Sequence, residues 1–345
     1  MAEEKKTKKL SIFLRIVIAL LIILVLIVGV AFFYVKGKLD KIQRVELPSD
    51  EDLGITETTA QNLTGYRNIA IFGVDSRSDD YGVGNRSDCI IIASINNDTG
   101  AIKLISVYRD TYVKIEGHGL DKITHAYSFG EAPLAIKTLN TNLDLNINEF
   151  VTVNFDSVAE AVDQLGGVQL TITSDEIKYI NGYIDETSRV TGKTSSHITQ
   201  PGTYTVDGVQ AVSYSRIRYT DGGDYKRTER MRTVIEAMFS KLKTKSITEI
   251  NSFADKILPH VYTNISATDI LAMVPSMSKY KVTESIGWPY DTKGKTMDRW
   301  YGIPVTLESN VTQLHKEAFG EEDYTPSDTV KSISANIVKK TGYTK

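Results

Sequence analysis

The chain has 345 residues, a formal net charge of −3 and ordinary proportions of apolar and charged side chains. A charge this close to zero argues against a nucleic-acid-binding protein, because such proteins concentrate Lys and Arg on one face. Cys89 is the only cysteine, so an intramolecular disulfide and a four-cysteine zinc site are both excluded. The five histidines are scattered without metal-binding spacing, so the sequence gives no support to zinc chemistry.

The N-terminal segment predicts a membrane anchor. Residues 1–15 are basic, and residues 16–35 form an uncharged run rich in Leu, Ile and Val. Twenty such residues in a helix extend about 30 Å, which is the thickness of the hydrocarbon core of a bilayer. Because positive charge stays on the cytoplasmic side, we predict a cytoplasmic basic tail at 1–15, a transmembrane helix at 16–35 and an exported remainder. A cleaved signal peptide is the alternative, since Gly29-Val30-Ala31 is a small-x-small triplet.

The exported part divides by composition into three segments. Residues 36–65 are polar and show no sustained apolar period, which predicts an extracytoplasmic stalk. A folded domain is predicted over residues 66–320. Residues 321–345 are predicted to be a loosely held C-terminal tail.

Strand and helix patterns alternate along the predicted domain. Short β-rich runs are expected as strands at 67–74, 89–95 and 101–108, with the last two forming a hairpin. Apolar residues then recur at helical spacing at 133–143, 157–165 and 224–243. The alternation predicts an α/β fold of three layers (α-β-α), in which a central mixed β-sheet is covered by helices on both faces.

Charged side chains stand where the predicted strands begin and end. Asp75 follows the first strand, Asp88 precedes the second, and Arg109 and Asp110 follow the third. If these strands are neighbours, Asp75 and Asp88 approach each other with Arg109 within reach. Two carboxylates suit Mg²⁺, which is normally held by one or two carboxylates together with phosphate oxygens. The alternative is that both aspartates are ordinary turn residues.

A second cluster of cations lies within residues 214–232. In an extended segment Arg216 and Arg218 would point to the same side. Arg227 and Arg230 share a face of the following helix, where we expect them in the first turn. The N-terminus of a helix already carries partial positive charge, so arginines there are unfavourable unless an anion such as pyrophosphate is bound. The alternative is a solvated basic face that pairs with the acidic residues of the same segment.

Seven segments between about Asn68 and Leu242 complete the pattern: GVDSR, NRSDCIIIASI, ISVYRDTYVKI, KITHAY, VTVNFDSVAEAVDQLGGV, DGVQAVSYSRIR and GDYKRTERMR. Together, and in this order, they resemble the LytR-CpsA-Psr family of bacterial cell-wall enzymes. The resemblance implies a phosphotransferase held in the cell membrane of a Gram-positive bacterium by a single span, with its C-terminal domain extracytoplasmic. Its donor would be a glycopolymer-phosphate on an undecaprenyl-pyrophosphate carrier, and its acceptor the muramic acid C6 hydroxyl of peptidoglycan.

The resemblance also implies roles for individual residues. Asp75 and Asp88 match the aspartates associated with Mg²⁺ (or Mn²⁺) and the pyrophosphate. The phosphates would be bound by five arginines, the last of them only adjacent in its motif: Arg109, Arg216, Arg218, Arg227 and Arg230. Asp110 is a candidate general base, or a residue that orients Arg109. The chain departs from the family pattern at Tyr108, where Pro is common, and at Met231, where Gln is frequent.

Several alternatives stay open at this stage. The transferred polymer can be wall teichoic acid, capsule or another secondary polymer. The same residues would serve a polyprenyl-pyrophosphate hydrolase, and a non-catalytic membrane-anchored regulator of envelope assembly is a third possibility. Any of the lipid-binding alternatives requires an apolar groove for the polyprenyl chain, which we expect between the sheet and a helix.

Overall fold

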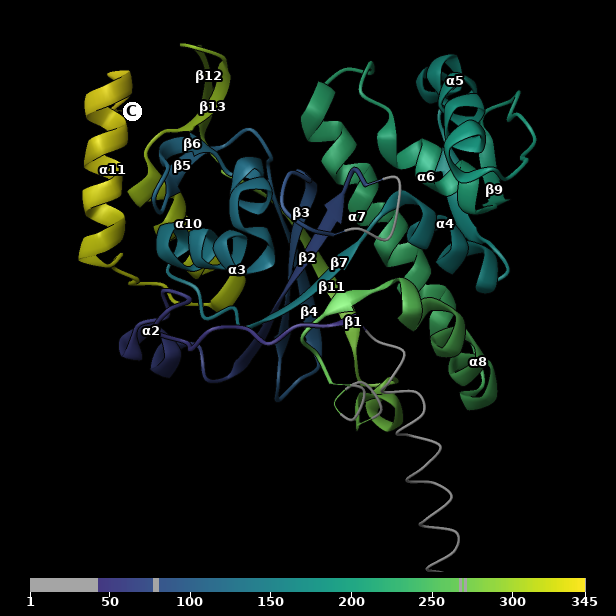
Figure 1. Ribbon diagram of the computed structural model, residues 1–345, viewed down its shortest axis with the longest axis horizontal. Coiled ribbons are helices and arrows are strands. Elements are labelled where there is room, and N and C mark those ends of the chain that lie inside the picture. Colours follow the sequence, from purple (N-terminus) through teal and green to yellow (C-terminus); the bar gives the residue numbers. More distant parts are fainter. Residues whose placement is uncertain (1–42, 77–80, 267–268, 270–271, 345) are drawn as a thin grey trace, which may run out of the picture.

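The computed structural model describes residues 43–76, 81–266, 269 and 272–344 (Figure 1). The predicted cytoplasmic tail and the predicted transmembrane helix at 16–35 lie outside these ranges. Within them, no helix is both long enough and apolar enough to cross a membrane. The membrane anchor therefore stays a prediction.

A mixed sheet of seven strands forms the centre of the molecule, in the order β1-β10-β7-β2-β3-β4-β11. The strands are β1 (Gln43–Arg44), β2 (Tyr66–Val74), β3 (Ser87–Asn96), β4 (Ala101–Val107), β7 (Glu149–Val153), β10 (Tyr262–Thr263) and β11 (Lys281–Trp288). The pairs β2–β3 and β3–β4 are antiparallel, whereas β2–β7 and β4–β11 are parallel. The predicted mixed sheet and the predicted hairpin of β3 and β4 are thus confirmed.

Helices cover both faces of this sheet (Figure 1). One layer contains α3 (Thr124–Leu143), α10 (Leu307–Phe319) and α11 (Asp328–Thr341), and the other contains α4 (Phe155–Gln164), α6 (Gly208–Arg216), α7 (Gly223–Leu242) and α8 (Ile247–Ile257). Successive residues of a strand point to opposite faces. Accordingly, Ile90 and Ile92 of β3 pack in the core under the first layer, while Ile91 and Ala93 pack against Met231 of α7.

The remaining elements surround this three-layer body. The short helix α2 (Glu57–Asn62), the longer helix α5 (Ser174–Thr191) and two 3₁₀ turns, η1 (Leu258–His260) and η2 (Val274–Ser276), also belong to the helical part. Three antiparallel strand pairs lie outside the main sheet. Two are hairpins, β5 (Tyr112–Ile115) with β6 (Gly119–Lys122) and β12 (Thr292–Thr296) with β13 (Trp300–Pro304), and the third pairs β8 (Val168–Ile172) with β9 (Gly202–Val206), between which α5 lies in the chain. A bridge between Thr111 and Gly302 joins the first hairpin to the last.

The prediction of a stalk over residues 36–65 is wrong for its described part. Leu53 and Leu63 are buried in the main core, and β1 adds a parallel edge strand to the sheet beside β10. The apolar residues are too few and too widely spaced to show a period in the sequence. They are buried by contacts with distant elements rather than by a local amphipathic pattern.

The prediction of a loosely held tail at 321–345 is also wrong. Residues 328–341 form α11, and Val330, Ile333 and Ile337 lie on one face of it and are buried in the main core. Their spacing of three and four residues is a helical stripe. The stripe is short and is surrounded by polar and charged residues, which hid the pattern in the sequence.

Candidate active site

The ends of β2, β3 and β4 bring the predicted residues to one edge of the sheet. Because β3 runs antiparallel to both neighbours, its start lies beside the end of β2, which leads to Asp75, and beside the end of β4, which leads to Arg109. The register shifts between Gly73 and Val74, which pair with Cys89 and Ser87, so Asp88 is the extra residue of a β-bulge. Bulges redirect side chains and are frequent next to functional sites.

A polar pocket of about 500 Å³ opens at this edge. It is lined by Asp75, Gly84, Asn85, Arg86, Asp88, Arg109, Phe155, Tyr183, Arg216, Arg218, Tyr219, Arg227 and Met231. The structure thus brings together two of the predicted aspartates, Asp75 and Asp88, and four of the five predicted arginines. The pocket is therefore strongly biased towards negatively charged ligands.

Asp88 is the centre of an ion network. Its Oδ1 lies 2.7 Å from Nη1 of Arg109, and its Oδ2 lies 3.4 Å from Nη2 of Arg218 and 3.8 Å from Nη1 of Arg227. The side chain of Arg227 is only 2% exposed. One carboxylate thus faces three guanidinium groups, which leaves an excess of positive charge in the part of the pocket around Asp88.

Two buried donors in this network have no acceptor. Nε of Arg109 and Nε of Arg227 make no hydrogen bond with any described residue. An unsatisfied buried donor costs about 1–3 kcal/mol, and more when it is charged. A bound phosphate oxygen would remove this cost, because guanidinium groups bind phosphate through such N–H donors.

Asp224 adds a second carboxylate to the arginines. Its Oδ1 lies 2.8 Å from Nη2 of Arg227 and 3.8 Å from Nε of Arg218. Burial raises the pKa of Asp224 to about 6, against the opposing effect of Arg218. The sequence showed Asp224 only as a counter-charge on a basic helix face, and nothing in the spacing marked it as part of the site.

The donor set fits a divalent cation that arrives with phosphate. Asp75 is exposed to the pocket and makes no ion pair with the described residues, whereas both oxygens of Asp88 are engaged by arginines. No group of three or more His, Cys, Asp or Glu within the described ranges is placed to hold a metal. Two carboxylates are sufficient for Mg²⁺ only when phosphate and water supply its other ligands.

Arg216 reaches the pocket from a helix rather than from the extended segment that we expected. It is the last residue of α6, and only Ile217 beyond it is extended. Its guanidinium lies 5.0 Å from the ring centroid of Phe155 and 5.5 Å from that of Tyr183, and it pairs with Glu186 at 2.8 Å. Cation–π contacts of this kind hold the guanidinium at the wall of the pocket.

Arg230 does not reach the pocket. Helix α7 begins at Gly223, so Arg227 and Arg230 lie beyond its first turn, contrary to our expectation. The guanidinium of Arg230 is buried and donates to the Glu176 carboxylate (2.7 Å), the Ile217 carbonyl (3.0 Å) and the Thr220 hydroxyl (2.7 Å). It therefore holds the loop that carries Arg218, and its donors are already used.

Asp110 faces away from the polar pocket. Its Oδ1 lies 2.6 Å from Nζ of Lys122 and 3.9 Å from Nε of Arg109, and the side chain lines a neighbouring hollow instead. Both of these contacts are with cations. The two roles expected of Asp110, general base and orientation of Arg109, stay predictions.

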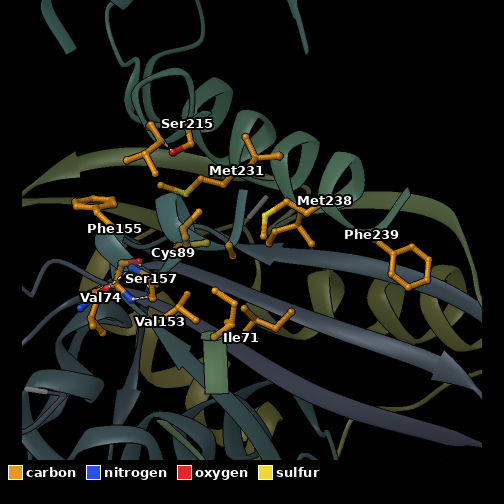
Figure 2. A pocket seen from close by; sticks show the side chains of 18 of the residues that line it. Ile71, Val74, Cys89, Val153, Phe155, Ser157, Ser215, Met231, Met238 and Phe239 are labelled. Atoms are coloured by element: carbon orange, nitrogen blue, oxygen red, sulfur yellow. Dashed lines mark hydrogen bonds between the residues drawn. The ribbon is translucent and has the colours of Figure 1, made fainter. Parts of the chain in front are cut away.

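An apolar groove of about 330 Å³ adjoins the polar pocket. Ile71 and Val153 of the sheet form one wall, and Met238 and Phe239 of α7 form the opposite wall (Figure 2). Cys89 also lines it, and burial raises the pKa of its thiol to about 12, so the thiol stays protonated. The expected groove between sheet and helix is therefore present.

The groove and the polar pocket share three lining residues: Asp88, Phe155 and Met231. Met231 stands where the family often has Gln, and here its thioether lies at the boundary between the two cavities. The site thus joins a cationic chamber to an apolar one. This is the arrangement expected of a protein that binds a lipid phosphate.

Comparison with known proteins agrees with a protein that binds a lipid phosphate. The model of the LytR_cpsA_psr family matches residues 32–315, and the chain belongs to this family. The resemblance drawn from the seven segments is confirmed.

Individual relatives cover most of the chain. A polyisoprenyl-teichoic acid–peptidoglycan teichoic acid transferase, TagT of Bacillus subtilis, is 29% identical over 304 residues, which are 84% of this chain and 90% of TagT. A TagU transferase of Bacillus licheniformis is 31% identical over 299 residues, 85% of this chain and 90% of the relative. A solved structure of TagT with bound octaprenyl pyrophosphate lipid has the same fold, with a TM-score of 0.52 at 23% identity over 81% of this chain and 92% of that one.

Proposed function

We propose that the protein transfers a glycopolymer-phosphate from a polyprenyl-pyrophosphate carrier to peptidoglycan. The observation that carries this proposal is the continuity of the arginine-lined pocket with the apolar groove through Asp88, Phe155 and Met231. A polyprenyl-pyrophosphate glycan has an apolar chain, a doubly charged centre and a polar sugar in the same order. The names of the TagT and TagU relatives, and the octaprenyl pyrophosphate bound to TagT, support this assignment.

The proposed reaction exchanges the phosphoanhydride bond of the donor for a phosphate ester bond to the acceptor. The oxygen of the muramic acid C6 hydroxyl forms a bond to the phosphorus that carries the glycan, and the bond from this phosphorus to the bridging oxygen breaks. Polyprenyl phosphate leaves, and the hydroxyl proton passes to a carboxylate beside the pocket. Arg109, Arg218 and Arg227 stabilise the charge that develops on the phosphate oxygens, which is the main requirement of phosphoryl transfer.

A divalent cation would also stabilise the negative charge on the phosphate oxygens. Asp75 and Asp88 are the residues that would hold Mg²⁺ or Mn²⁺, and the ion would neutralise the pyrophosphate oxygens. The proposed location is the outer face of the cell membrane of a Gram-positive bacterium, with residues 16–35 as a single-pass anchor. A membrane anchor would keep the groove close to a donor that is itself a lipid.

The polymer proposed for this chain is a teichoic acid, because the TagT and TagU relatives are named as teichoic acid transferases. Capsule and other secondary polymers present the same pyrophosphate link, so the contacts of the arginines do not differ among them. The specificity for the polymer must therefore depend on contacts with the sugars. Tyr219 and Tyr183, which line the polar pocket, are the aromatic side chains available for these contacts.

The test uses the full-length chain in detergent with a lipid-linked pyrophosphate glycan as donor and uncrosslinked peptidoglycan as acceptor. Mass spectrometry should detect the phosphodiester product, and Arg109→Ala should lower its rate by about 10²–10³, as for removal of a transition-state donor. Arg189→Ala is the matched control, because Arg189 lies in the exposed last turn of α5. Release of polyprenyl phosphate without the phosphodiester would identify a hydrolase, and absence of any turnover would identify a binding protein.

A further inference from the structure

A second hollow, of about 220 Å³, lies beside the polar pocket. It is lined by Tyr108, Asp110, Thr111, Gly222, Gly223, Asp224, Tyr225, Thr292, Trp300 and Gly302. These residues come from the end of β4, the start of α7 and the β12–β13 hairpin. The backbone N–H of Gly302 donates to the Asp110 carbonyl at 2.9 Å, which fixes the hairpin to the segment that carries Arg109.

Two aromatic rings in this hollow remain open to solvent. Tyr225 is 38% exposed and Trp300 is 45% exposed, although large aromatic side chains are usually covered. Each ring is nevertheless supported from behind. The ring of Tyr108 packs edge-on against Tyr225 with 4.4 Å between centroids, and a Cβ on Gly294 would lie 2.9 Å from Nε1 of Trp300.

Carboxylates complete the lining of the hollow. Asp110 pairs with Lys122 at 2.6 Å, and Asp224 pairs with Arg227 at 2.8 Å, so each carboxylate is held in place by a cation. Ionised carboxylates accept hydrogen bonds from hydroxyl groups. A pocket that combines open aromatic faces with a few fixed acceptors suits a sugar ring, whose faces are apolar and whose edge carries hydroxyls.

The position of the hollow connects it to the phosphate chemistry. Asp224 lines the hollow, and its partner Arg227 lines the polar pocket, so a ligand in the hollow lies across one ion pair from the phosphate site. Tyr183 and Tyr219 already provide aromatic contacts within the polar pocket itself. The two cavities therefore offer separate aromatic surfaces on the two sides of the arginine network.

We propose that this hollow is the subsite for the acceptor sugar, with Tyr225 and Trp300 packing against the sugar and Asp224 accepting a hydrogen bond from the hydroxyl that attacks. This inference rests on the proposed function, since it assigns the second substrate of that transfer. It divides the site into a donor side, formed by the polar pocket and the groove, and an acceptor side, formed by the hollow.

A binding experiment tests the subsite without turnover. Trp288 and Trp300 are the two tryptophans of the chain, and Trp288 is 0% exposed, so a soluble ligand changes the emission chiefly through Trp300. Titration of the full-length chain in detergent with a peptidoglycan oligosaccharide should give a saturable change in tryptophan emission. The change should disappear in Trp300→Phe, and its absence in the unmodified chain would overturn the proposal.

Kinetic measurements separate this inference from the proposed function. Trp300→Ala and Tyr225→Ala should each raise the KM for the acceptor roughly tenfold, the effect of losing one aromatic contact, with less than a twofold change in the KM for the donor. Trp300→Phe should recover most of the loss, and Ile247→Ala, which removes an exposed apolar side chain elsewhere, should change neither KM. Melting temperatures would identify a variant that simply unfolds.

The two failures are distinguishable. If the unmodified chain forms no phosphodiester product, the proposed function fails. If the unmodified chain forms the product but both alanine variants keep its acceptor KM, only the subsite fails.

Discussion

Replacement of Asp88 by Asn tests whether the arginine network is built around an anion. Asn keeps the size of the side chain but removes the charge that faces Arg109, Arg218 and Arg227 at 2.7, 3.4 and 3.8 Å. Removing one partner of a buried ion pair costs about 3–5 kcal/mol. Because Asn can still accept one hydrogen bond, we expect a loss of about 3 kcal/mol in the free energy of unfolding.

The loss should be reversible by an added anion. About 3 kcal/mol corresponds to a drop of about 5 °C in melting temperature for a folded domain of about 300 residues. Inorganic pyrophosphate supplies negative charge to the same guanidinium groups, and at about 100 times its Kd it stabilises the folded state by about 2.7 kcal/mol. In Asp88→Asn, saturating pyrophosphate should therefore restore most of the melting temperature, whereas the unmodified chain should respond less because Asp88 competes with the anion.

The assay is thermal unfolding of the full-length chain in detergent at low salt with a metal chelator, with and without pyrophosphate. Asp185→Asn is the control, because Asp185 is exposed and its pairing with His197 is worth at most about 1 kcal/mol. Equal stability of Asp88→Asn and the unmodified chain, or no effect of pyrophosphate on either, would refute the reasoning.

Three further predictions concern the neighbouring residues. Glu176→Ala should lower the free energy of unfolding by about 3–5 kcal/mol, because it leaves Arg230 buried without its carboxylate partner. Chemical denaturation measures this loss. A raised KM for the donor with unchanged stability would instead indicate that Arg230 contacts the phosphate directly. Met238→Trp should fill the groove and raise the KM of a long-chain polyprenyl donor well above that of a short-chain analogue; an equal change for both donors would contradict a lipid site there. Burial raises the pKa of Asp224 from 3.8 in the unfolded chain to about 6 in the folded protein. Between these pH values the folded state binds more protons than the unfolded state, so this carboxyl lowers the stability of the protein as pH rises. The stability of the unmodified chain relative to Asp224→Asn should fall between about pH 4 and pH 6, and an increase over that range would contradict the assignment.

The strand ends of the site could be predicted because they depend on local patterns. The apolar runs around 67–74, 89–95 and 101–108 define antiparallel neighbours, and this arrangement alone brings Asp75, Asp88 and Arg109 to one edge. No knowledge of distant contacts is needed for that step. The arginines beyond residue 214 required more information.

Arg227 and Arg230 show why the rest could not be predicted. They lie three residues apart on one helix, and their spacing alone gives no reason to prefer either as a phosphate ligand. The difference comes from Glu176 of α5, which accepts a hydrogen bond from Arg230 in a buried ion pair and so keeps Arg230 out of the pocket. The hollow beside the polar pocket was missed for the same reason, since only the packing of the β12–β13 hairpin places Trp300 in the same lining as Tyr225.

Helix α7 contributes to both cavities at once. Arg227 lines the polar pocket, Met238 lines the groove, and Met231 between them lines both. Arg227 and Met238 are eleven residues apart, which is about 16 Å along a helix at 1.5 Å per residue. A single rigid element therefore sets the distance between the charged head and the hydrocarbon chain of any lipid that occupies both cavities. If α7 separated from the sheet, the head and the hydrocarbon chain of such a lipid would lose their contacts at the same time. Retention of the lipid and packing of α7 on the sheet are therefore one cooperative property.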